Sequence, residues 1–204
     1  MRWLAQFISI IFHPLLFTTY LVFILGWFNP SLLMIRMENL RLVVIFVFCF
    51  TFVLPGINLV MFRYFGNITS LHMRTQQERI WPFIFIALTY TLVTFLFYFK
   101  LPFSENFNKL MLVVSILVVA ATISTFIMKV SVHSLAMMGM LSILFWLNNG
   151  ADSVGLWWLT IGLTLVSGIV MSARLYLNAH TLNEVLWGGL IGLVVGSSVT
   201  LILY

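Results

Sequence analysis

Long uncharged apolar runs are the feature that most constrains this chain. Four runs contain no Asp, Glu, Lys or Arg, and they cover 3–27, 42–62, 80–99 and 110–128. A helix needs about 20 apolar residues to cross the hydrocarbon core of a bilayer. Because backbone polar groups in lipid must be satisfied within the segment, such runs predict transmembrane helices.

Three further segments, 132–147, 154–173 and 185–204, complete the pattern, and the first of these is short for a crossing. The chain is therefore expected to be all-α, a polytopic transmembrane helical bundle of six to seven spans. We expect one integral membrane domain over 1–204. Gly188, Gly192 and Gly196 recur at four-residue spacing, which predicts a face where another helix approaches closely.

Composition excludes the soluble alternatives. The 204 residues are 62% hydrophobic and 7% charged, which is too few charges to cover a soluble particle. The net charge of +5 comes from scattered basic residues, so no nucleic-acid partner is expected. We expect a multi-pass protein of a bacterial inner membrane, with membrane lipids around it.

Alternating crossings assign the loops to two sides. Side A holds the N-terminus, the 63–79 loop and the corners at 129–133 and 174–184, and side B holds the other connections. Lys and Arg number six on side A and four on side B, which favours a cytoplasmic side A. If four of the side-A cations serve a ligand, the count becomes two against four, so the orientation stays open.

Side A also gathers the ionisable residues at helix ends, which are costly in a membrane and are usually functional. The residues that could carry chemistry there are Arg74, Arg79, Lys129, Ser131, His133, Arg174, His180 and Glu184. Cations with two histidines and one carboxylate suit the binding of an anion such as phosphate. Phosphoryl transfer is the matching chemistry.

His180 and Glu184 are four residues apart, so on a helix the carboxylate can accept a hydrogen bond from one imidazole nitrogen. The other nitrogen is then free to attack phosphorus and form a phosphoenzyme. His133 is the candidate that protonates the leaving alkoxide. The charge of the transition state would be neutralised by Arg79, Lys129 and Arg174.

Several of the polar residues have an alternative, purely structural interpretation. Arg2 and Arg63 are expected to anchor at lipid headgroups, and Arg74 alone is balanced between that role and ligand binding. His13, next to Pro14, is typical of an interhelical hydrogen bond. A metal site is disfavoured because no compact set of three ligands is present.

The three corners resemble the tripartite signature of the type 2 phosphatidic acid phosphatase (PAP2) superfamily, which reads K-x6-R-P, P-S-G-H and S-R-x5-H-x3-D. The third motif is matched in spacing by Arg174, His180 and Glu184, with alanine in place of the serine and glutamate in place of the aspartate. A helix with regularly spaced glycines follows it, as in family members.

The second motif keeps its serine and histidine at Ser131 and His133, while valines replace the proline and glycine. The first motif departs further, because Arg79 stands three residues before Pro82 instead of directly before it. The missing lysine is replaced by Arg74 or Lys129.

The resemblance implies a PAP2-like core over about 70–204, preceded by two helices over 3–62. It implies a phosphatase that needs no metal or other cofactor and acts on lipid phosphates such as phosphatidic acid, phosphatidylglycerol phosphate or isoprenyl diphosphate. In this reading His180 is the nucleophile, His133 the general acid and Glu184 the orienting carboxylate. The phosphate ligands include Arg79, Ser131 and Arg174.

Two other functions stay open at this stage. The protein could bind or transport an anionic lipid without chemistry, keeping the phosphate pocket, or it could be a helical structural subunit whose side-A charges only anchor it. The oligomeric state and the particular lipid are not determined by the sequence.

Overall fold

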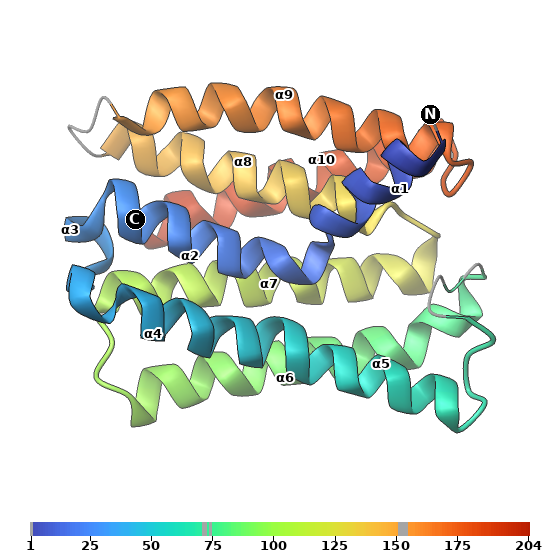
Figure 1. Ribbon diagram of the computed structural model, residues 1–204, viewed down its shortest axis with the longest axis horizontal. Coiled ribbons are helices and arrows are strands. Elements are labelled where there is room, and N and C mark those ends of the chain that lie inside the picture. The colour runs from blue at the N-terminus through green and yellow to red at the C-terminus, as the bar shows by residue number, and fades with distance from the viewer. Residues whose placement is uncertain (1, 71–72, 74, 151–154) are drawn as a thin grey trace.

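The computed structural model of the chain describes residues 2–70, 73, 75–150 and 155–204. Every regular element in these ranges is a helix, which confirms the all-α prediction (Figure 1). Within the described ranges, six segments are long and apolar enough to cross a membrane: Arg2–Phe28, Met37–Tyr64, Gln77–Lys100, Glu105–Ile127, Trp157–Tyr176 and Leu182–Leu203. The chain is therefore an integral membrane protein.

The first span is not one continuous helix. It consists of α1 (Arg2–Ile11), the short 3-10 helix η1 (Pro14–Leu16) and α2 (Phe17–Phe28). Proline lacks an N–H and clashes with the preceding turn, so the helix breaks where Pro14 begins η1.

The second span is interrupted as well. It consists of α4 (Met37–Phe48), the π-helical turn η2 (Cys49–Val53) and α5 (Leu54–Tyr64), and the one-turn helix α3 (Pro30–Leu33) precedes it. The wider π turn directly precedes α5, and Pro55 is the second residue of that helix.

The remaining helices are longer. They are α6 (Gln77–Lys100), α7 (Glu105–Ile127), α8 (Val132–Gly150), α9 (Gly155–Tyr176) and α10 (Leu182–Leu203). The fifth expected segment, 132–147, corresponds to the shorter apolar helix Val132–Asn148 within α8. Figure 1 shows α8 lying along α9 and α10 between the same two ends of the bundle.

Alternating crossings predicted two groups of connections, and Figure 1 shows this arrangement. The N-terminal end lies at one end of the bundle, together with the corners after α5, α7 and α9. This end is side A. The connection after α6, helix α3, the end of α8, the start of α9 and the C-terminus lie at the opposite end, side B.

The glycine face of α10 packs against α8. A Cβ atom at Gly188 would overlap the Ser131 carbonyl oxygen, and one at Gly192 would overlap the Leu135 carbonyl oxygen. The backbones therefore approach as closely as the glycine spacing predicts. This contact holds the side-A ends of α8 and α10 together.

The outward faces of the bundle carry exposed large apolar side chains, as expected for surfaces that face lipid tails. Among them are Leu42, Leu92, Leu165, Leu190 and Ile202. The interior core includes the fully buried Phe97, Phe107 and Leu144.

Candidate active site

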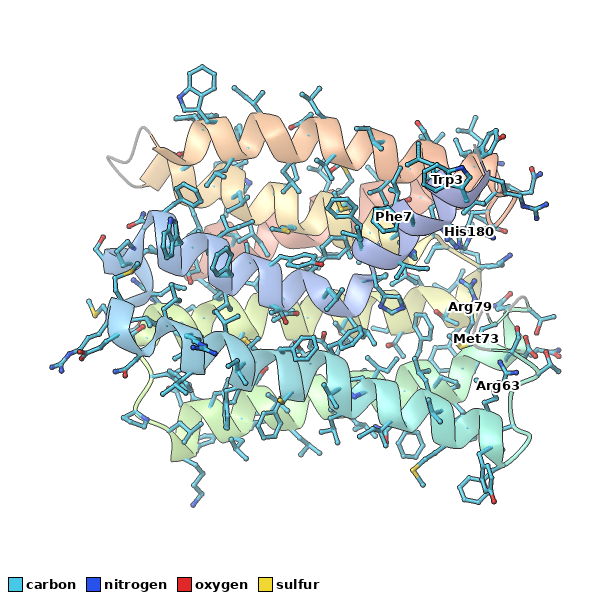
Figure 2. All side chains as sticks on the ribbon, in the orientation of Figure 1. Trp3, Phe7, Arg63, Met73, Arg79 and His180 are labelled. Atoms are coloured by element: carbon cyan, nitrogen blue, oxygen red, sulfur yellow. The ribbon has the colours of Figure 1, made fainter. Side chains whose placement is uncertain are left out.

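A cavity of about 1060 Å³ lies inside the side-A half of the bundle. Five of the residues predicted from the sequence line it, and they come from three corners of the chain: Arg79, Lys129, His133, Arg174 and His180. Figure 2 shows Arg79 and His180 at the same end of the molecule. The structure thus brings together residues that lie up to about a hundred positions apart in the sequence.

The position of His180 follows from the local turn between α9 and α10. Asn178 adopts a left-handed conformation with φ of 51°, which asparagine tolerates better than most residues, and this ends α9. Thr181 then caps α10, since its side-chain oxygen accepts a hydrogen bond from the Glu184 N–H. The short turn between these two caps holds His180 beside the first turn of α10.

The His180 ring is oriented by Glu184. Nδ1 of His180 lies 2.5 Å from Oε2 of Glu184, and the ring is buried, with 8% of the residue exposed. A carboxylate only accepts hydrogen bonds, so Nδ1 carries the proton. Nε2 makes no hydrogen bond within the described part of the chain, so it is the nitrogen free to react with a ligand in the cavity.

The surroundings keep His180 neutral. Burial lowers the pKa of the His180 ring below its ordinary value, and the nearby Arg79 and Arg174 guanidinium groups lower this pKa further. The hydrogen bond to Glu184 raises the pKa but does not outweigh burial. The ring is therefore unprotonated at neutral pH, as a nucleophilic imidazole must be.

Arg79 is buried at the start of α6 and joins two loops. Its Nε donates to the Met73 carbonyl at 3.0 Å, and its Nη1 donates to the Val130 carbonyl at 3.1 Å. Arginine has five N–H donors, so these two bonds fix the side chain and leave others for a ligand in the cavity.

Lys129 and Arg174, two further predicted cations, have different environments. Lys129 Nζ lies 3.7 Å from Oε2 of Glu184 and 3.5 Å from the Ala179 carbonyl oxygen. Arg174 Nε is buried and has no hydrogen-bond partner among the residues that the structure describes. A buried unpaired donor on a charged group is costly, so this nitrogen is suited to an anionic ligand.

His133, at the start of α8, contacts the first span of the chain. Its Nε2 lies 3.1 Å from the carbonyl oxygen of Ser9 in α1. Its ring also meets the ring of His13 edge to face, with 6.1 Å between the ring centroids. The first span therefore forms part of the site, which the sequence motifs did not indicate.

Two of the predicted residues that the structure describes, Glu184 and Ser131, do not line the cavity. Glu184 stands behind His180, as an orienting carboxylate should. Ser131 is fully buried, and its hydroxyl oxygen accepts a 2.9 Å hydrogen bond from Ser134. Its backbone N–H donates to the Glu184 carbonyl at 2.9 Å, which ties the α8 corner to α10. Arg74 lies outside the described residues.

The cavity also contains residues to which sequence reasoning gave no site role. Arg2, expected to be a headgroup anchor, lines the cavity, as does His13. His13 Nδ1 accepts a 3.4 Å hydrogen bond from the Leu15 N–H and so caps η1. The sequence could have indicated a site role for His13, because it stands before a proline within an apolar run. A helix break at such a proline exposes backbone and side-chain polar groups.

The charge lining the cavity is one-sided. Among the described residues, its wall includes four basic side chains and no Asp or Glu: Arg2, Arg79, Lys129 and Arg174. Glu184, behind His180, and Glu78, whose charge also acts on Arg79, offset these four charges in part. The polar end of the cavity therefore favours an anionic group of more than one negative charge.

The rest of the cavity is apolar and deep. Its wall continues to Ile143 on α8 and to Tyr90 on α6, ten and eleven residues beyond His133 and Arg79. At a rise of 1.5 Å per residue this is about 15 Å along each helix. Half of the hydrocarbon core of a bilayer is also about 15 Å thick. The cavity thus combines a cationic end with an apolar section about as deep as one leaflet.

In the described ranges, no three His, Cys, Asp or Glu side chains are grouped as ligands for one metal ion. Comparisons of the chain with protein-family models, with curated proteins and with solved structures found no match.

Proposed function

We propose that the protein is a membrane lipid phosphatase that hydrolyses a phosphate monoester or diphosphate through a phosphohistidine intermediate. The substrate class is that of phosphatidic acid, phosphatidylglycerol phosphate or isoprenyl diphosphate. The resemblance of the three corners to the PAP2 signature supports this proposal. We propose that the chain belongs to the PAP2 superfamily and that its PAP2-like core covers about 70–204.

In the first step, Nε2 of His180 attacks phosphorus, and the bond from phosphorus to the lipid oxygen breaks. Glu184 accepts a hydrogen bond from Nδ1–H and stabilises the positive charge that develops on the ring. His133 gives a proton to the departing lipid oxygen. The phosphoryl oxygens are neutralised by Arg79, Lys129 and Arg174.

In the second step, water attacks phosphorus and the bond to His180 breaks. His133, now a neutral ring, takes a proton from that water, which returns both histidines to their starting states. The products are inorganic phosphate and the lipid alcohol, or the lipid monophosphate when the substrate is a diphosphate. No metal or cofactor enters either step.

The observation that carries the proposal is the shared cavity. The two predicted histidines, His133 and His180, and three predicted cations line its polar end, and the apolar section beyond them has the depth of one leaflet. A soluble phosphate ester needs only the polar end. A lipid phosphate uses both parts, with its headgroup at the cations and its hydrocarbon chain in the apolar section.

The test is phosphate release by the purified protein in detergent, against a panel of lipid phosphates with chelator present. The expected result for His180→Ala is loss of turnover on the order of 10³-fold or more, because the nucleophile is removed. Rapid quenching of the unchanged protein with ³²P-labelled substrate should trap an acid-labile, alkali-stable phosphoprotein that His180→Ala does not form.

Arg174→Gln and Arg41→Gln provide a matched pair, since Arg41 is exposed on side B, away from the cavity. Only Arg174→Gln should weaken turnover. Binding of lipid phosphates without phosphate release, in a folded protein, would contradict the proposal and support the alternative of an anionic-lipid binding or transport protein.

A further inference from the structure

The helix break in the first span leaves backbone carbonyl groups without helical partners. The last hydrogen bond of α1 runs from the Phe12 N–H to the Ile8 carbonyl, at 2.9 Å. In an unbroken helix, the His13 N–H would bond to the Ser9 carbonyl and residue 14 would bond to the Ile10 carbonyl. Pro14 has no N–H, and η1 begins instead.

Two of these carbonyl groups find side-chain partners elsewhere. The Tyr20 hydroxyl donates to the Ile11 carbonyl at 2.9 Å, which closes the break from within the same span. The Ser9 carbonyl lies 3.1 Å from Nε2 of His133 on α8. Polar groups released by a proline inside a membrane are expected to be satisfied in this way.

The Ser9 contact determines which nitrogen of His133 carries the proton. A carbonyl oxygen only accepts hydrogen bonds, so Nε2 is the donor, and in the neutral ring Nδ1 has the free lone pair. The hydrogen bond persists when the ring gains a second proton. Nδ1 is therefore the nitrogen at which a proton can be gained and lost without breaking the contact to α1.

We propose that the His13–Pro14 break is a positioning device, in which the released Ser9 carbonyl holds the His133 ring by Nε2–H and directs Nδ1 to the leaving-group oxygen. The proposal rests on the proposed function for the role of His133 in proton transfer. Pro14 acts through Ser9 and His133, and the break itself contacts no reacting atom in the mechanism.

The decisive variant is Pro14→Ala, which permits helical bonds from residues 13 and 14 back to the Ser9 and Ile10 carbonyls. In protein labelled with ¹⁵N-histidine, neutral His133 should give the signals of an Nε2–H ring in the unchanged protein. In Pro14→Ala it should give a mixture of the two neutral forms. A spectrum of His133→Gln assigns the signals among the four histidines.

Kinetics supply a second readout. A general acid matters most for a poor leaving group, so Pro14→Ala should slow hydrolysis of an alkyl lipid phosphate about tenfold more than that of an aryl phosphate. Pro55→Ala is the matched control, because Pro55 is buried in the second span and does not line the cavity. It should leave both the spectrum and this ratio unchanged.

A second pair of variants keeps the test independent of how Pro14→Ala folds. The amide nitrogen of glutamine can take the place of Nε2, whereas that of asparagine reaches only the position of Nδ1. His133→Gln should therefore retain the contact to Ser9 and unfold at a higher temperature than His133→Asn. Equal stability, or the reverse order, would contradict the assignment of Nε2.

The outcomes separate the two proposals. An unchanged His133 spectrum and leaving-group ratio in a folded Pro14→Ala protein would overturn the positioning role and leave the phosphatase proposal standing. Alkyl phosphate hydrolysis at the unchanged rate in His133→Gln would instead overturn the role of His133 in the mechanism, whatever the spectra show.

Discussion

At the scale of the residue, the chemistry proposed here depends on an unprotonated His180. Burial lowers the pKa of this ring, Arg79 and Arg174 lower the pKa further, and the Glu184 carboxylate acts in the opposite direction. We therefore expect the His180 titration, followed by NMR in the ligand-free protein, to have its midpoint below the ordinary value of 6.5. Phosphoenzyme formation should rise with pH through that midpoint, as the ring loses its proton.

Variants of the residues around His180 test why its pKa is lowered. Glu184→Gln removes the carboxylate that favours the protonated ring, so it should move the His180 midpoint to a still lower pH. Arg174→Gln should move it upward, and Arg41→Gln on side B should not move it. A midpoint at or above 6.5 in the unchanged protein would contradict the role assigned to burial.

At the scale of the element, the pairing of α10 with α8 holds the site together. Gly192→Ala would place a methyl group against the Leu135 carbonyl, where only backbone movement makes room. We expect this change to destabilise the folded protein by about 1–3 kcal/mol, the usual cost of overpacking a well-packed contact. Thermal unfolding in detergent measures it.

Gly162→Ala on α9 is the matched control, because no neighbouring atom of the described residues lies within 4 Å of a Cβ atom built there. Alanine is also the better helix former, so this variant should unfold at the same temperature or slightly higher. If both variants behaved alike, the close approach of α8 and α10 would not be the source of stability at this face.

At the scale of the whole molecule, the depth of the cavity should determine which substrates are used well. Ala121 on α7 lines the apolar section, while its neighbour Ala120 does not. Ala121→Phe should fill part of this space and lower turnover of long-chain lipid phosphates, with little effect on a short-chain phosphate ester. Ala120→Phe should spare both, as measured by phosphate release.

If Ala121→Phe lowered turnover of short-chain and long-chain substrates equally, the apolar section would not be the part of the cavity that receives the hydrocarbon chain. A loss confined to long chains, together with an intact His180 phosphoenzyme, would locate the chain in the cavity.

Much of this protein is determined by the sequence alone, because the information is local. Whether a segment can cross a bilayer depends on its own length and apolarity, so the expected spans appear in the structure near their predicted bounds. The glycine contact of α10 follows from four-residue helical spacing and needs only one helix to be predicted correctly. The sequence also paired His180 with Glu184, but His180 precedes the Thr181 cap of α10, so their contact comes from the turn before the helix and not from helical spacing.

Only the tertiary structure decided which side chains share the cavity. In a helix that is apolar on all sides, the sequence does not mark which face packs against the other helices. The rotation of such a helix about its axis therefore cannot be predicted from its hydropathy. The structure turns Ser131 toward Ser134 and away from the cavity, and it places Arg2 and His13 on the cavity wall. The Ser9 carbonyl meets His133 across 124 positions of sequence, a distance that no local pattern spans.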